Sequence, residues 1–79
     1  MSKCGPWLRS GASFVRSCEA AGGRGVSLRV SPAREGRSWT YSVSGLWGLE
    51  GSGMRRSLIG AQRAAVRIVA RLPRAKYGE

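Results

Sequence analysis

The arginines between residues 54 and 74 are the side chains whose type and spacing could do chemistry. This segment, MRRSLIGAQRAAVRIVARLPR, holds six of the chain's twelve arginines and no acidic residue. Guanidinium groups form charge-assisted, often paired hydrogen bonds with phosphates and carboxylates, so the chemistry on offer is the binding of anions. At about 100° per residue of an α-helix, one face carries Arg56, Arg63, Arg67, Arg71 and Arg74. We predict that this face binds an anionic partner.

The opposite face of the same segment is apolar. It carries Leu58, Ala61, Ala65, Ile68, Val69 and Leu72. This separation predicts an amphipathic, arginine-rich helix over residues 54–74, with Ser52 or Ser57 as its N-cap and an end near Pro73. The apolar residues form the predicted docking face of this helix.

Catalysis is not expected, because the residue types that it needs are missing. The chain has no histidine and no aspartate, and its glutamates are far apart in the sequence: Glu19, Glu35, Glu50 and Glu79. A nucleophile or a bound water therefore has no paired base. Two cysteines alone cannot complete a zinc site, and no glycine-rich stretch has the spacing of a phosphate-binding loop. We predict a non-enzymatic protein with no catalytic residue, cofactor, metal or small-molecule substrate.

The net charge indicates which partners to expect. Fourteen lysines and arginines against four glutamates give +10 at pH 7 over 79 residues, a length that allows one domain at most. Such a charge favours anionic partners. The abundance of arginine, glycine and serine is also what GC-rich codons produce. An alternative explanation is therefore a recently arisen reading frame with no strongly selected activity.

An alternating pattern predicts a β-hairpin within residues 26–53. Apolar residues occupy every second position of two short runs, which contain Val26, Leu28 and Val30, then Trp39, Tyr41 and Val43. Pro32 and Gly36 mark the turn between the runs. Four glycines between residues 44 and 53 predict that a linker follows the second strand.

The N-terminal segment, residues 1–25, and the tail, residues 75–79, are predicted to be mostly disordered. Within the first segment only ASFVRSCEAA has the composition of a short helix. Lys3, Arg9 and Arg16 precede the first acidic residue, as in a mitochondrial transit peptide. Because proline and glycine would interrupt the helix that such signals form, an ordinary flexible basic terminus is preferred over targeting.

Reduced thiols are favoured for Cys4 and Cys18. Their spacing could close one loop, but disulfide scaffolds of secreted proteins usually have four or more cysteines in a short chain. The first ten residues also lack the apolar core of a secretion signal, and no stretch approaches the ~18 apolar residues of a membrane-spanning helix. We therefore expect an intracellular protein, and leave mitochondria, nucleus and cytoplasm as alternatives.

These elements together predict a small α+β fold of marginal stability. The helix 54–74 would cover the apolar face of the hairpin in a ββα unit, because a two-stranded hairpin alone is barely stable in water. The alanines on the helix face, Ala61 and Ala65, bury little area, so we expect this unit to be loose or dependent on a partner.

Four functions fit the arginines of the helix. In the first, the helix covers the hairpin and its arginines only face water. In the second, it lies on an anionic membrane, and in the third it docks in an acidic, apolar groove of a partner protein. In the fourth, its arginines bind RNA or DNA phosphates. Membrane surface and partner groove rank above nucleic acid, because an apolar face is superfluous for binding phosphates. The chain is thus predicted to be a small basic binding or regulatory protein, and the sequence does not determine its oligomeric state.

Overall fold

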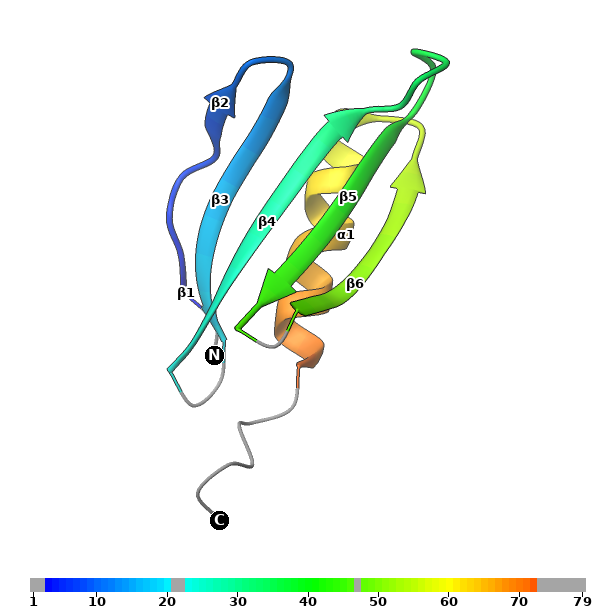
Figure 1. The fold of residues 1–79 in the computed structure, drawn as a ribbon. Coiled ribbons are helices and arrows are strands. Elements are labelled where there is room, and N and C mark those ends of the chain that lie inside the picture. Colours follow the sequence, from blue (N-terminus) through cyan, green and yellow to red (C-terminus); the bar gives the residue numbers. More distant parts are fainter. Residues whose placement is uncertain (1–2, 21–22, 47, 73–79) are drawn as a thin grey trace.

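In the residues that the structure describes, a single antiparallel sheet has one helix across one face (Figure 1). The computed structural model describes residues 3–20, 23–46 and 48–72. Its elements are β1 (Lys3–Cys4), β2 (Leu8–Ser10), β3 (Ser13–Ala20), β4 (Arg24–Pro32), β5 (Trp39–Gly45), β6 (Gly48–Arg55) and α1 (Leu58–Arg71). The spatial order is β1-β3-β4-β5-β6, and β2 also pairs with β3. Each strand is therefore antiparallel to its neighbours.

Alternation of side chains across the pleat separates a core face from an open face of the sheet. The strand residues buried beneath α1 are Cys18, Ala20, Val26, Leu28, Val30, Tyr41 and Val43. In the predicted hairpin, Leu28 pairs with Val43 and Val30 pairs with Tyr41. The β4–β5 hairpin and the identity of its apolar face are therefore confirmed.

Helix α1 lies close against the sheet because small residues of the helix face the strands. Ala61, Ala65 and Val69 are at most 1% exposed, and alanines allow the helix backbone to approach the strands. Ser57 is the N-cap, and its hydroxyl accepts a hydrogen bond of 3.0 Å from the backbone N–H of Gly60. The helix ends at Arg71. The observed helix is therefore shorter than the predicted 54–74.

The prediction of a ββα unit with a disordered N-terminal third is wrong. Residues 13–20, expected to be disordered or helical, form β3, which pairs with β4 over seven residue pairs from Phe14↔Val30 to Ala20↔Arg24. Both β1 and β2 pair with the outer edge of β3. The described part of the chain is a β-rich α+β fold with six strands. Pairing with a strand that is distant in sequence, rather than local composition, orders this part of the chain.

The predicted glycine-rich linker is also a strand, β6, and it includes the first two residues of the predicted helix. Two of its glycines, Gly51 and Gly53, leave room for neighbouring side chains. An ideal Cβ at Gly51 would lie 2.9 Å from Cδ1 of Ile68, and one at Gly53 would lie 2.6 Å from Cζ of Tyr41. Gly51 and Gly53 therefore allow close packing against β6 and do not make it a flexible linker.

Cys4 and Cys18 form a disulfide, contrary to the expectation of reduced thiols. Strand β1 places Cys4 directly opposite Cys18 of β3, with their Cα atoms 4.0 Å apart. The sequence spacing alone could not show this register. The bond attaches β1 covalently to β3.

Two further predictions concern the C-terminal end of the chain and the absence of a membrane-spanning helix. Arg74 and the predicted tail 75–79 lie outside the described residues. Among the residues that are described, α1 is neither long nor apolar enough to cross a membrane.

Candidate anion-binding groove

A shallow groove of about 380 Å³ lies between α1 and the segment that carries β1 and β2. The residues that line it are Trp7, Arg16, Ile59, Gln62, Arg63, Val66 and Arg67. Two of the five predicted anion-binding arginines, Arg63 and Arg67, are thus brought together with an arginine and a tryptophan from the other end of the chain.

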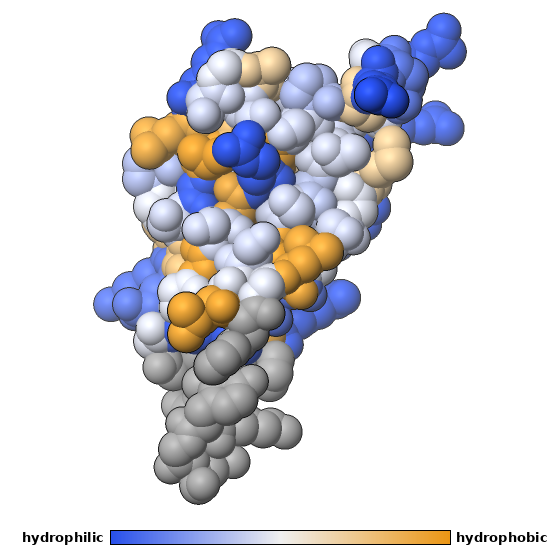
Figure 2. Space-filling model, viewed as in Figure 1, coloured by the Kyte–Doolittle hydropathy of each residue, from blue (hydrophilic) through white to orange (hydrophobic). Residues whose placement is uncertain are grey.

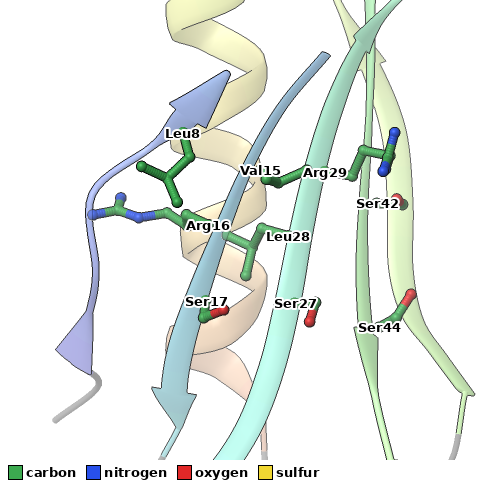
Figure 3. A pocket seen from close by; sticks show the side chains of 9 residues that line it. All are labelled: Leu8, Val15, Arg16, Ser17, Ser27, Leu28, Arg29, Ser42 and Ser44. Carbon is green, nitrogen blue, oxygen red and sulfur yellow. The ribbon is translucent and has the colours of Figure 1, made fainter. Parts of the chain in front are cut away.

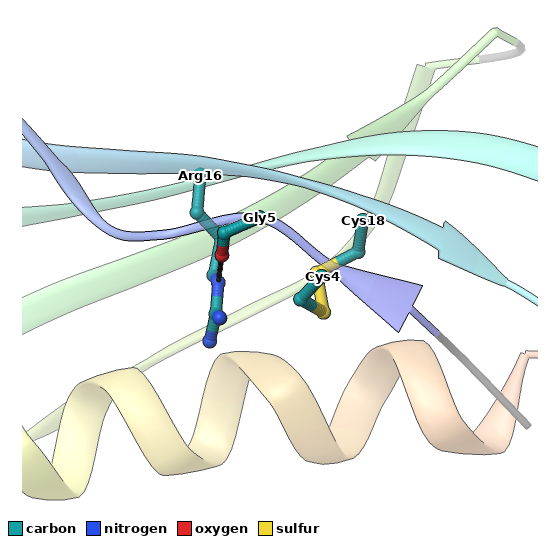
Figure 4. Close-up of a disulfide and its surroundings, with 4 residues drawn as sticks. All are labelled: Cys4, Gly5, Arg16 and Cys18. Atoms are coloured by element: carbon teal, nitrogen blue, oxygen red, sulfur yellow. Dashed lines mark hydrogen bonds between the residues drawn. A yellow bond between two sulfur atoms is a disulfide. The ribbon is translucent and has the colours of Figure 1, made fainter.

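Arg16 reaches the groove because of its position in β3. It pairs with Leu28 of β4, whose side chain is buried under the helix, so the side chain of Arg16 also points toward α1 (Figure 4). Its Nε donates a hydrogen bond of 2.7 Å to the carbonyl oxygen of Gly5. The guanidinium carbon lies 5.1 Å from the centre of the Trp7 ring, a cation–π contact. Arg16 is therefore held by its neighbours before any ligand binds.

The chain that carries β1 is fixed to β3 next to the residue that Arg16 contacts, Gly5. The disulfide joins Cys4 to Cys18 (Figure 4). The backbone N–H of Gly5 also donates a hydrogen bond of 2.9 Å to the carbonyl oxygen of Ser17. Trp7 follows two residues later and is half-buried. These attachments hold the indole ring at one wall of the groove.

Arg63 and Arg67 stand one helical turn apart and are exposed. Neither forms an ion pair within the described residues. The pairing that the structure does show for an arginine joins Arg24 to Glu50, and neither of these residues lines the groove. Three guanidinium groups therefore share one groove with no carboxylate in its lining, and an anion placed there would relieve their mutual repulsion.

The other predicted anion-binding residues do not join this groove. Arg56 lies in the turn before α1 and lines a separate hollow with Glu35, Arg37 and Ser38. Arg71 is exposed in the last turn of the helix. The predicted face therefore divides into separate groups, and only its middle part faces a groove.

The predicted apolar docking face packs inside the molecule. Ala61, Ala65 and Val69 are buried against the sheet. Leu58, Ile68 and Leu72 are half-buried and contact the same core. This arrangement matches the alternative in which the helix simply covers the hairpin.

No family model, curated protein or solved structure matches this chain. The groove must therefore be judged by its chemistry. Its arginines offer forked donors suited to phosphate, and the Trp7 ring offers a flat apolar surface. The described residues contain no group of three or more histidines, cysteines or acids that could hold a metal ion.

The open face of the sheet has a second shallow hollow, of about 470 Å³ (Figure 3). Serines form a row across three strands, in which Ser17 pairs with Ser27 and Ser27 pairs with Ser44. Arg29 stands beside them on β4, and Leu8 and Val15 lie at one side (Figure 3). In the space-filling view this face is mostly pale, with separate apolar areas (Figure 2). Arg16 also lines this hollow, but its guanidinium is held over the Trp7 ring and its Nε donates to Gly5. With the guanidinium of Arg29 and no aromatic ring, this hollow is a weaker anion site than the groove.

Proposed function

We propose that this chain is a non-enzymatic binding protein that holds single-stranded nucleic acid in the groove between α1 and the N-terminal segment. The observation that carries the proposal is the convergence of Arg16, Arg63 and Arg67 beside the ring of Trp7. Arginines bind the phosphates of the backbone, and an aromatic ring can stack on an unpaired base. A base within a duplex is already stacked, so this combination favours single strands.

Packing of the apolar helix face supports nucleic acid over a membrane or a partner groove. Both of those alternatives use the apolar face of the helix, whose central residues Ala61, Ala65 and Val69 are buried on the sheet. The helix would have to leave the sheet, which would also expose Leu28 and Val43 to water. Phosphate binding by Arg63 and Arg67 requires no such rearrangement.

The test compares two double variants that remove the same charge. Arg63→Gln with Arg67→Gln empties the groove of its two helix arginines. Arg34→Gln with Arg37→Gln removes two exposed arginines from the β4–β5 turn. Fluorescence anisotropy with a labelled oligouridine of about ten nucleotides should show a loss of affinity of tenfold or more, roughly the loss of two charge-assisted contacts, for the groove variant. The turn variant should bind nearly as the parent does.

Salt dependence separates phosphate contacts from general attraction. Each lost contact to a single strand should reduce the slope of log K against log salt concentration by about 0.7. The groove variant should therefore lose about 1.4 from the slope, measured between about 50 and 200 mM salt. Trp7→Ala should weaken binding by about 1–3 kcal/mol if a base stacks on the ring.

Two results would refute the proposal. Equal weakening by the groove and turn variants would mean that net charge alone attracts the RNA. Binding to anionic phospholipid vesicles, with no measurable binding to the oligouridine, would instead favour the membrane alternative.

A further inference from the structure

The two edges of the sheet differ in the features that block the addition of another strand. At one edge β1 and β2 are two and three residues long, and Pro6 lies between them. Lys3 and Arg9 add charge to this edge. Short strands, prolines and charged side chains are common means by which proteins protect a sheet edge. The β1–β2 edge is therefore protected.

The opposite edge, β6, has none of this protection in its centre. It is a continuous strand of eight residues, Gly48–Arg55, with no proline. Among the described strands, only β5 pairs with it (Figure 1). Gly51, Ser52 and Gly53 at its centre have no bulky side chain to cover the backbone. In an antiparallel pair, alternate residues direct both their N–H and their C=O groups to the outer side, so β6 presents unused backbone donors and acceptors.

The C-terminal end of β6 is strongly basic. Arg55 and Arg56 are exposed. Arg37 from the β4–β5 turn lines the same hollow as Arg56, together with Glu35, whose carboxylate accepts a hydrogen bond from Ser38. The guanidinium of Arg55 lies 5.4 Å from the ring centre of Tyr41 and donates to the carbonyl oxygen of Met54. Neither Arg55 nor Arg56 forms an ion pair within the described residues. An acidic segment beside β6 would meet these charges.

Glu50 is the acidic residue of β6 itself, and its charge is already balanced. Its carboxylate pairs with Arg24, and both side chains are largely buried, 17% and 13% exposed. The electrostatic character of the edge is therefore set by the arginines at its C-terminal end.

We propose that β6 binds an extended acidic segment of a partner protein as an additional strand of the sheet. The peptide backbone would lie along Gly51, Ser52 and Gly53 and pair with the outward-facing backbone groups of alternate residues there, as in other cases of strand addition. Acidic side chains would then lie near Arg55 and Arg56. A second copy of this chain is a poorer occupant, because each copy carries +10 and like charges repel. This edge site is separate from the groove beside α1, and the inference does not depend on the function proposed for that groove.

The probe is a labelled peptide of alternating glutamate and threonine, about as long as β6 and blocked at both ends. Its control has the same number of glutamates but prolines at two central threonines, which removes backbone donors while keeping the charge. We expect the first peptide to bind at least tenfold more tightly by anisotropy. Hydrogen exchange followed by NMR should show new protection of backbone amides within residues 51–54, and not in α1.

Protein variants test the role of the arginines in the proposed edge site. Arg55→Gln with Arg56→Gln should weaken the glutamate–threonine peptide by about fivefold to tenfold, as expected for two exposed charge pairs. Arg9→Gln with Arg34→Gln removes the same charge from other exposed positions and should have little effect. Circular dichroism confirms that each variant is folded.

Three outcomes would overturn the inference. Equal binding of the proline control would show that charge alone attracts the peptide. Protection in α1 and not in β6 would place the peptide elsewhere. Self-association by sedimentation, with protection of residues 51–54 in the absence of peptide, would make a second copy the occupant.

Discussion

Replacement of Gly53 by alanine tests the packing of β6 most directly. An ideal Cβ at this position would lie 2.6 Å from Cζ and 3.0 Å from Cε2 of Tyr41, whereas carbon atoms pack at about 3.5–4.0 Å. The ring would have to move by about 1 Å to restore such a contact. Tyr41 is only 8% exposed and Arg55 covers its ring, so the movement would disturb the core. Overpacking of this kind costs about 1–3 kcal/mol.

Thermal unfolding followed by circular dichroism measures this cost. For a domain of about this size each kcal/mol corresponds to about 4–8 °C, so Gly53→Ala should lower the midpoint by about 4–24 °C. Gly25→Ala is the matched control, because Gly25 is also in a strand and an added Cβ there has no atom within 4 Å. The control should unfold at or slightly above the midpoint of the parent. Equal midpoints for the two variants would refute the argument that Tyr41 packs over Gly53.

Three further perturbations test other parts of the fold. Reduction of the Cys4–Cys18 bond should lower the free energy of unfolding by about 3 kcal/mol, the value for a loop of about 15 residues, as measured in urea; an unchanged midpoint would contradict this. Ser57→Ala should cost about 1 kcal/mol by removing the N-cap, and a variant as stable as the parent in urea would show that the cap is unimportant. Leu28→Ala should cost about 2–5 kcal/mol, whereas Leu46→Ala should change stability by less than about 0.5 kcal/mol; similar losses in thermal melts would contradict their opposite burial.

The parts of the fold that could be predicted are those with a local periodic signal. Val26, Leu28 and Val30 alternate with polar residues, which predicts one buried strand face without knowledge of its partner. The apolar and charged faces of α1 are separated in the same way. Such patterns depend only on residue spacing along one element, so they can be recognised in a single sequence.

The strands that were missed lack such a signal or depend on distant partners. In β3, Phe14, Arg16 and Cys18 face the helix, and an arginine among them hides the alternation. In β6, glycine is unfavourable for a strand, yet Gly51 and Gly53 are needed because Ile68 and Tyr41 occupy the space of their side chains. Tertiary packing overrides intrinsic preference in both strands.

The candidate site was predictable only in part. Arg63 and Arg67 follow from the helical spacing of arginines. Arg16 belongs to β3, and Trp7 lies between β1 and β2; they enter the groove through pairing of β3 with β4 and of β1 with β3. A strand assignment for residues 13–20 would have placed Arg16 on the same face as Cys18, and this was the signal that could have found it.

The Cys4–Cys18 bond has a consequence for the turn between β2 and β3. Gly11 and Ala12 form this exposed turn, inside the covalent loop that the bond closes. If a protease cuts the backbone there, the short N-terminal fragment stays attached through sulfur, and β1 remains beside β3. Such a nicked molecule would migrate as a single species on a gel without reductant and separate into two only after the sulfur link is broken.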